Sequence, residues 1–506
     1  TLGSLIFAVI NVQSPVYASN QNQYHLHGLA QAGYGFLEND WLSNTLDPVP
    51  VFSWLIKISY QLFNLDAVNY FLYTVLMGVY FFSLLGILDY FFSIFQSHRK
   101  TFVFAGVILL LHAALIRRVL VLVAGDEWKY VLEGGFAGQR LLGPVFQPSS
   151  FGVLLVASIY FFLRKKTFWA VLLLPIAATF HPTYLLSAAL LTAIYLLVDY
   201  SENNSFKTMF GYGGVALGLV LPIVFYTVTL FSPTDAETIA KARDAMVNFR
   251  IPHHALVQQW FNASVIVRLG IVGVTIYLLR NTRLFWVLVV PGLLGLGFTV
   301  LQVLTQNNSL ALLFPWRFST FLVPLSTVFL AASGINNIWG WLEMQKWLFV
   351  FGVTLLLLFG AAGILQFQAE VDIKENAPEF ALQAYVRENL TAGQNYIIPA
   401  GFQDFRLATG SPAVIEFKSI PYQDVEVLEW LSRVNNVSRI YREPYAEDIC
   451  EHLWRTAWQF KATHIILPQT EFGLSCSWLE EIYNDGDYAV RVMYLESWDQ
   501  LDFLPQ

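Results

Sequence analysis

The sequence predicts a polytopic α-helical membrane protein with about eleven spans, followed by a soluble α/β domain at the C-terminus. Apolar residues make up 56% of the 506 positions and charged residues only 13%, whereas an average soluble domain is about a quarter charged. The charge is also unevenly divided. Residues 1–368 hold 19 basic and 14 acidic residues, and residues 369–506 hold 10 and 22. This change in net charge divides the chain into a membrane domain, residues 1–368, and a tail domain, residues 369–506.

The membrane domain is predicted from apolar runs long enough to cross a bilayer, which takes about 20 helical residues. The chain begins without methionine, so we expect that residues precede it and that residues 2–18 are the end of a first span. Pro182 predicts a break between two spans, since proline excludes the helical conformation from the residue before it. The other spans are expected at residues 68–95, 101–118, 149–164, 167–182, 183–200, 208–231, 264–280, 284–303, 317–338 and 347–368.

The orientation follows from the short connections on one side, because each of them carries a cation. The cations are Arg99, Lys100, Arg164, Lys165, Lys166, Lys207, Arg280, Arg283 and Lys346. Short basic loops stay in the cytoplasm. This rule places the tail outside the cytoplasm, together with the long loops at residues 19–67, 119–148, 232–263 and 304–316. The apolar stretch Pro50–Phe63 is then expected to be a helix at the outer interface.

The tail alternates predicted helices and strands, which is typical of a small α/β sandwich with some parallel strands. Helices are expected at residues 379–391, 424–434 and 446–460, and strands at 396–399, 413–417, 464–467 and 488–494. The acidic charge of the tail argues against nucleic acid as a ligand and favours a protein partner.

Both cysteines of the chain, Cys450 and Cys476, lie in the tail. In an oxidising compartment they would form a disulfide that closes a loop of about 26 residues and adds ~3 kcal/mol of stability in the loop-entropy model. Two buried free thiols are the alternative.

Asp40 and Asp47 in the first long loop are the candidate catalytic acids. Asp40 is framed by Phe36 and Trp41, aromatic residues that favour the headgroup level of a membrane. A carboxylate desolvated there can act as a general base or hold a metal. Each aspartate also fits a helix cap, and Asp47 does so together with the proline that follows it.

The same loop contains His25 and His27, which are candidate metal ligands. One of them, together with Asp40 and a histidine from the third long loop, fits a Zn²⁺ or Mn²⁺ site by residue type. The sequence therefore leaves a divalent metal open as a cofactor.

Cations in the other long loops are candidates for binding a phosphate group. Arg140 follows a glycine-rich stretch, Arg250, His253 and His254 surround a proline, and Arg317 lies at the mouth of a span. Arg317 fits a snorkelling anchor equally well. The chain has no Walker, GxGxxG, HExxH, GxSxG or CxxC motif, which argues against nucleotide-driven work.

The long loop after the first span, the number of about eleven spans, the His181-Pro182 hairpin at the outer end of its helices and the extracytoplasmic C-terminal α/β domain together resemble the GT-C superfamily. Three pieces of sequence look like a bacterial, largely cyanobacterial branch of GT-C-like proteins. They are Arg250-Ile-Pro-His253-His254, Pro315-Trp-Arg317, and Phe405-Arg406 with Phe417-Lys418 and Pro421-Tyr422. GT-C proteins are integral membrane glycosyltransferases that use polyprenyl-phosphate-linked sugars. The resemblance implies an enzyme of the bacterial inner membrane that transfers a sugar from such a lipid to an acceptor on the extracytoplasmic side.

The resemblance also assigns roles to residues. Arg250, His253 and Arg317 would hold the charge of the leaving lipid phosphate. The catalytic base of the family is an acidic residue soon after the first span, where this chain reads Asn20-Gln-Asn-Gln-Tyr24 without an acid. The role of the base would therefore fall to Asp40.

Two other functions fit the sequence. The missing early acid favours a non-catalytic GT-C-like envelope subunit or assembly factor that uses the acidic tail to bind its partner. A transporter or flippase is the third possibility, but the sequence shows no clear internal repeat, and its charges gather at one face of the membrane domain.

Overall fold

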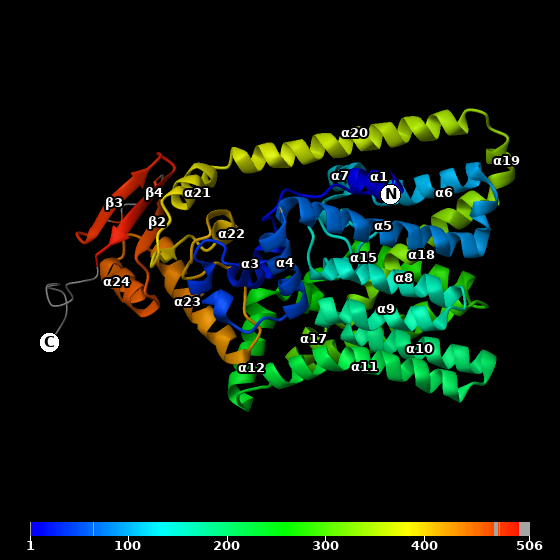
Figure 1. Cartoon of the computed structure of the whole chain (residues 1–506), viewed down its shortest axis with the longest axis horizontal. Helices are drawn as coiled ribbons and strands as arrows, with labels where there is room; N and C mark the ends of the chain where they lie inside the picture. Colours follow the sequence, from blue (N-terminus) through cyan, green and yellow to red (C-terminus); the bar gives the residue numbers. More distant parts are fainter. Residues whose placement is uncertain (1, 64, 470–473, 475, 495–506) are drawn as a thin grey trace. The chain divides into compact units, whose positions relative to one another are not determined.

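The computed structural model describes residues 2–63, 65–469, 474 and 476–494. It is mostly helical and contains a four-stranded sheet near the C-terminus (Figure 1). The chain divides into two compact units. Unit 1 consists of Thr1–Ser14, Asn69–Thr229 and Met246–Ala369, and unit 2 consists of Pro15–Val68, Leu230–Ala245 and Glu370–Gln506. The change of unit after Ala369 lies at the expected domain boundary, but unit 2 also contains most of the first long loop.

Unit 1 is built from helices and short helical turns. They are α1 (Leu2–Asn11), most of α5 (Leu65–Phe92), η3 (Ile94–Gln96), α6 (His98–Leu111), α7 (Ala114–Ala124), η4 (Asp126–Trp128), η5 (Pro148–Gly152), α8 (Val153–Leu163), α9 (Thr167–Phe180), η6 (Pro182–Tyr184), α10 (Leu185–Asn203), α11 (Phe206–Leu230), η7 (Ala245–Arg250), α13 (Pro252–Ala255), α14 (Val257–Trp260), α15 (Ala263–Leu278), α16 (Arg283–Thr305), α17 (Asn308–Leu312), η8 (Pro315–Phe318), α18 (Ser319–Asn337), α19 (Trp339–Glu343) and most of α20 (Leu348–Glu375).

Six helices among the described residues are long and apolar enough to cross a membrane. They are Leu65–Phe92, Pro182–Asn203, Phe206–Leu230, Arg283–Thr305, Asn308–Asn337 and Leu348–Glu375. The pair α6 and α7, bent by 49° at its break, passes the same test as one broken span. These helices indicate a membrane protein, but the predicted number of about eleven spans is not confirmed, because the other apolar helices are short.

The expected break at Pro182 is present. Helix α9 ends at Phe180, His181 is extended with φ −144° and ψ 99°, and α10 begins at Leu185 after the short turn η6. The backbone restriction that proline imposes on the preceding residue accounts for this geometry.

A buried arginine connects three helices of unit 1. Arg283 at the start of α16 donates two hydrogen bonds of 2.7 Å to the carboxylate of Glu202 on α10. A third bond of 2.7 Å reaches the carbonyl of Phe162 on α8. Because a paired guanidinium in this position satisfies donors that would otherwise be buried alone, it fixes the helices relative to one another.

Unit 2 combines short helices with the sheet. Its elements are α2 (Gln21–Tyr24), α3 (Leu26–Ala32), η1 (Leu37–Asn39), η2 (Leu42–Asn44), α4 (Pro50–Leu62), α12 (Ala236–Asp244), α21 (Glu379–Glu388), β1 (Tyr396–Ile397), α22 (Phe405–Thr409), α23 (Asp424–Arg442), α24 (Ile449–Phe460), β2 (His464–Pro468), β3 (Leu479–Asn484) and β4 (Tyr488–Met493). The strand order is β1-β2-β4-β3, in which β1 and β2 are parallel and the other pairs are antiparallel.

The expected strand at residues 413–417 is wrong. Only Ala413 pairs with the sheet, through an isolated parallel bridge to Tyr396. The backbone of Ala413 bonds to side chains instead: its N–H donates to Asp40 and its carbonyl accepts from Arg406. The apolar run Ala413–Ile415 is buried, but its hydrogen bonds do not continue the ladder.

Cys450 on α24 and Cys476 before β3 are joined by a disulfide. The two cysteines are separated by 26 positions. Cys476 is 6% exposed. The bond therefore connects a helix of unit 2 to its edge hairpin.

We expect reduction of this disulfide to destabilise unit 2 by about 3 kcal/mol, because the unfolded chain regains the entropy of the opened loop. Thermal unfolding of the full chain in mild detergent, with and without a reductant, measures the change. The control is the double variant Cys450→Ser/Cys476→Ser, which should unfold at the lower temperature under both conditions. An unchanged midpoint on reduction of the wild type would contradict the expectation.

Candidate functional site

Asp40 lies in unit 2 between the short turns η1 and η2. Its backbone is extended, with φ −71° and ψ 134°, so that the side chain turns back over η2. The Oδ1 atom accepts hydrogen bonds from the N–H groups of Leu42, at 2.8 Å, and Ser43, at 3.3 Å. This is the arrangement of a cap at the start of a helical turn.

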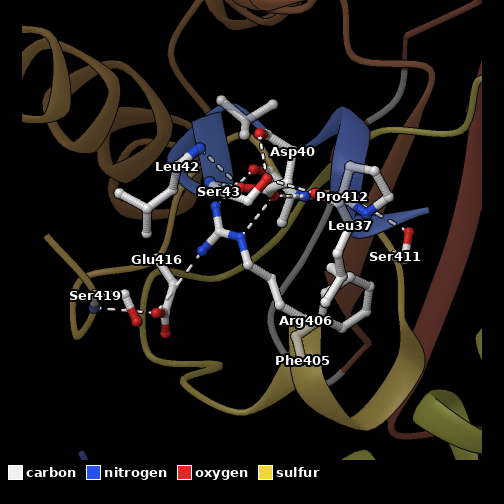
Figure 2. A network of polar contacts seen from close by, with 12 residues as sticks. Leu37, Asp40, Leu42, Ser43, Phe405, Arg406, Ser411, Pro412, Glu416 and Ser419 are labelled. Carbon is white, nitrogen blue, oxygen red and sulfur yellow. Dashed lines mark hydrogen bonds and ion pairs between the residues drawn. The ribbon is translucent and has the colours of Figure 1, made fainter. Parts of the chain in front are cut away.

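The second oxygen of Asp40 binds a buried arginine. Figure 2 shows the carboxylate facing the guanidinium of Arg406, whose Nε donates to Oδ2 at 2.7 Å. The N–H of Ala413 donates to the same oxygen at 2.9 Å. The side chains of Asp40 and Arg406 are 0% and 3% exposed. Four donors thus surround a carboxylate that water does not reach.

These contacts make Asp40 a structural group in this structure. A general base has to lie within hydrogen-bond reach of the proton that it removes. Both oxygens of Asp40 are committed to backbone and guanidinium donors, and the residue is fully buried. The predicted role of Asp40 as catalytic base is therefore not supported by its geometry.

Glu416 completes this buried network. Its Oε1 lies 3.7 Å from Nη1 of Arg406 and accepts a 3.0 Å hydrogen bond from the N–H of Ser419 (Figure 2). Its Oε2 has no hydrogen-bond partner among the described residues. Burial raises the pKa of Glu416 to about 7, although the neighbouring Arg406 acts in the opposite direction. One buried guanidinium thus faces two carboxylates, and it forms the shorter contact with Asp40.

The other predicted residues of the first loop also have structural contacts. Asp47 accepts a 2.9 Å bond from the N–H of Val49, directly before α4. His27 is bonded through Nε2 to the carbonyl of Thr45 at 3.1 Å. His25 is 0% exposed, with its ring edge-on to Phe52. Among the residues that the structure describes, no three His, Cys, Asp or Glu side chains are grouped to hold a metal ion. The metal site of His25 and His27 is therefore not supported.

The predicted phosphate-binding residues all lie in unit 1, and a glycine-rich loop brings several of their segments together. Gly135 approaches the start of α18 so closely that a Cβ would lie 2.5 Å from Oγ of Ser319. The next residue, Phe136, donates its N–H to the same hydroxyl at 2.7 Å. Arg268 on α15 donates to the carbonyl of Gly135. We call the loop residues 134–140, with the segments that they contact, the loop junction.

His254 binds the loop junction from α13. Its Nδ1 lies 2.5 Å from the carbonyl oxygen of Ala137, and its ring lies beside Gly138. Because a carbonyl can only accept, Nδ1 carries the hydrogen and the basic lone pair of the neutral ring is on Nε2. His253 is exposed on the same short helix, 4.1 Å away between ring centroids.

Arg317 and Arg140 reach the same region by different contacts. Arg317, in the turn η8 two residues before Ser319, has its Nη1 2.5 Å from Oγ1 of Thr183 and 3.3 Å from Nε2 of His181. Arg140 stacks on the ring of Tyr130, with 3.8 Å between the guanidinium carbon and the ring centroid. Arg317 therefore connects the His181-Pro182 corner to η8.

Arg250 ends η7, two residues before α13, and is half-buried. The loop junction thus combines Arg140, His254 and Arg317 with segments 134–138 and 316–320. Arg250 and His253 lie in the segment next to His254.

A cavity of about 310 Å³ lies beside the junction. Phe136, Trp260, Trp316 and Ser319 form part of its wall, and the rest is mainly aliphatic residues of α15 and α16. The ring of Phe136 stacks on Trp260, and Trp260 lies 5.1 Å from Trp316. Unit 1 therefore has polar and cationic side chains directly next to an apolar cavity.

Sequence reasoning missed three participants. Glu416 stands in the apolar run Ala-Val-Ile-Glu-Phe, and such an isolated carboxylate is a usable signal of a buried ion pair. Arg406 carries no such signal, because its partner Asp40 is 366 positions away. Arg268 is the third, and it donates to the carbonyl of Gly135 and the hydroxyl of Ser264.

Residues 377–437 match the model of a domain of unknown function, DUF6798. The match begins before α21, ends within α23 and contains both Arg406 and Glu416. No curated protein matches the chain. The comparison therefore assigns a family model to part of unit 2 and adds no activity.

We predict that Asp40→Asn destabilises unit 2 by about 3–5 kcal/mol, because an amide removes the counter-charge that is hydrogen-bonded to the buried guanidinium of Arg406. Denaturant unfolding of the full chain in mild detergent measures the effect. Glu38→Gln is the matched control, since Glu38 is an exposed carboxylate two residues earlier, and its effect should stay within about 0.5 kcal/mol. Equal free energies of unfolding for the two variants would contradict a structural role of Asp40.

Glu416→Gln should stabilise unit 2 at alkaline pH. The folded-state pKa of about 7 lies above the ordinary 4.5. Protonated Glu416 therefore contributes fully to the free energy of unfolding below pH 4.5, and this contribution is lost as pH rises through 7. A glutamine side chain does not ionise, so the variant keeps its stability over the same range. We expect the variant to gain up to roughly 3 kcal/mol over wild type at pH 8 and almost nothing near pH 4.5. Unfolding free energies across this range test the slope, and a constant difference at all pH values would refute the assignment.

Proposed function

We propose that the chain is a GT-C-like glycosyltransferase that transfers a sugar from a polyprenyl-phosphate donor at the loop junction of unit 1. The observation that carries the proposal is that His254 and the start of α18, two residues after Arg317, both contact the glycine-rich loop, in a unit rich in long apolar helices. A lipid phosphate needs hydrogen-bond donors and positive charge beside hydrocarbon. The junction supplies groups of this kind.

The membrane topology of the proposal has eleven spans. This number results if the bent pair α6–α7 counts as one span and the four shorter apolar helices are added to the six long ones. The basic short turns, such as Arg164-Lys165-Lys166, would then face the cytoplasm. The loop junction and unit 2 would lie on the extracytoplasmic side of a bacterial inner membrane, where polyprenyl-phosphate sugars are used by GT-C proteins.

Arg317 is the proposed ligand of the phosphate group. Its planar guanidinium suits a phosphate because two parallel N–H groups can bind two oxygens. In the structure Nη1 contacts the neutral side chains of Thr183 and His181. These contacts orient the guanidinium at the His181-Pro182 corner.

His254 is the proposed proton acceptor, in place of Asp40. The bond from Nδ1 to Ala137 fixes the tautomer whose Nε2 is basic. In the reaction the acceptor hydroxyl oxygen bonds to the anomeric carbon, and the bond from that carbon to the phosphate oxygen breaks. The lipid phosphate leaves with the electron pair and is held by Arg317, while the hydroxyl proton passes to Nε2 of His254.

His254→Gln should lower turnover by about 10²–10⁴-fold if the ring accepts the proton. Purified full-length protein in lipid nanodiscs is incubated with polyprenyl-phosphate-linked glucose or mannose and candidate glycolipid acceptors. Release of free polyprenyl phosphate is measured against pH. His98→Gln is the control because His98 is an exposed histidine of unit 1 outside the loop junction, and it should keep wild-type turnover. Equal turnover of the two variants would exclude His254 as the base.

A non-catalytic envelope subunit is the second candidate function. Two observations favour it. Asp40 is held in hydrogen bonds by Arg406 and the backbone of Ala413, and residues 20–24 contain no acid. On this alternative the wild type releases no polyprenyl phosphate from any donor. It also purifies from mild detergent with a stoichiometric protein partner that binds the acidic tail.

A further inference from the structure

Cationic side chains surround the ring of Tyr130, which precedes the glycine-rich loop of unit 1. The guanidinium carbon of Arg140 lies 3.8 Å from the ring centroid, and Nζ of Lys129 lies 5.5 Å from it. The guanidinium of Arg117 lies 5.6 Å from the same centroid. The electrons of an aromatic ring attract cations in such positions, so the ring helps to orient them. We call Lys129, Tyr130 and Arg140 the cationic platform.

The protein neutralises Arg117 but not the two cations of the platform. Arg117 donates to the carboxylate of Glu133 at 2.7 Å. Lys129 and Arg140 form no ion pair and no side-chain hydrogen bond within the part of the chain that the structure describes, and the hydroxyl of Tyr130 forms none there either. Lys129 is exposed, and Tyr130 and Arg140 are half-buried. The platform therefore offers two positive charges and a hydroxyl donor to an external anion.

Two further carboxylates lie near the platform along the chain. Asp126 and Glu127 belong to the turn η4, directly before Lys129, and both are exposed. Neither is paired with a cation among the described residues. Because exposed charges interact through water, where the Coulomb energy is small, these two carboxylates leave the donors of the platform unoccupied.

The helix before the platform has an apolar outer face. Val119, Leu122 and Val123 of α7 are 45%, 80% and 81% exposed, and the exposed Arg118 lies on the same face of the helix. A helix with exposed apolar residues beside a cation is suited to the boundary between lipid headgroups and acyl chains. The turn η4, which leads to the platform, contacts α7. Helix α7 would therefore bring the platform to the level of the headgroups.

We propose that the cationic platform binds the phosphate group of an anionic phospholipid of the bilayer, whose acyl chains lie against α7. The guanidinium of Arg140 can donate two parallel N–H groups to two phosphate oxygens, and Lys129 adds a second charge. A zwitterionic headgroup suits the platform less well, because it carries a cation of its own. A free phosphate ester has no chain to pack on Leu122 and Val123. The site does not depend on the proposed transfer reaction.

The test compares two phospholipids that share their acyl chains and differ in the charge of the headgroup. Delipidated full-length protein in mild detergent is titrated with phosphatidylglycerol and with phosphatidylcholine, and bound lipid is counted by native mass spectrometry. We expect phosphatidylglycerol to bind about tenfold more tightly or more, because each cation near anionic lipid contributes a several-fold factor. Equal affinity of the two lipids would overturn the proposal.

Variants locate the site. Lys129→Gln/Arg140→Gln should reduce the affinity for phosphatidylglycerol to that for phosphatidylcholine. Lys207→Gln/Arg280→Gln is the control matched in charge, since both residues are exposed cations of unit 1 outside the platform, and it should keep the preference. An equal loss of preference in the two double variants would contradict a localised site.

A single substitution covers the case in which the double variant of the platform does not fold. Lys129→Gln lies at an exposed position, where a substitution has little effect on folding. It should reduce the preference for phosphatidylglycerol by about fivefold, the share of one cation. An unchanged preference in this variant would overturn the assignment of Lys129.

Two other phosphate compounds identify the source of the ligand. Glycerol 3-phosphate should not displace phosphatidylglycerol, and displacement at equal concentration would indicate a site for soluble phosphate esters. Polyprenyl phosphate should bind no more tightly than phosphatidylglycerol, because the platform has no contact that distinguishes a prenyl chain from an acyl chain. Tighter binding would assign the platform to the sugar donor. Either result would overturn the proposal, whereas loss of sugar transfer in His254→Gln leaves these binding results unaffected.

Discussion

A guanidinium buried inside unit 2 has to be neutralised where it lies, and Asp40 does this for Arg406. The pair joins residues 366 positions apart, and its remaining hydrogen bonds hold the backbone of Ala413 and the turn at Leu42. Removing Arg406 would leave Asp40 buried without a counter-charge, and removing Asp40 would leave Arg406 only the more distant Glu416, 3.7 Å away; either change is destabilising. This requirement makes the first loop and the C-terminal segment parts of one folded unit.

The same pair changes the interpretation of the first loop. A loop that supplies a catalytic acid needs a carboxylate with at least one accessible oxygen, whereas Asp40 has none. The contacts of Asp47 and His27 with nearby backbone groups point in the same direction. These residues were candidates for catalysis because they are polar and lie near aromatic residues. In the structure their polar side chains hold irregular backbone together. Long segments without regular structure need side chains of this kind to satisfy their buried N–H and carbonyl groups.

Much of the fold was predictable because local sequence determines it. Apolar length predicts the six long helices, and Pro182 predicts the break before α10. The prediction of a strand at Ala413 was wrong because the backbone of this residue bonds to the side chains of Asp40 and Arg406. These contacts depend on tertiary structure, so no local sequence pattern predicts them. The predicted phosphate-binding residues were chosen by charge and loop position. What assembles their segments is the close approach of Gly135 to α18, and sequence alone does not show which surface a glycine approaches.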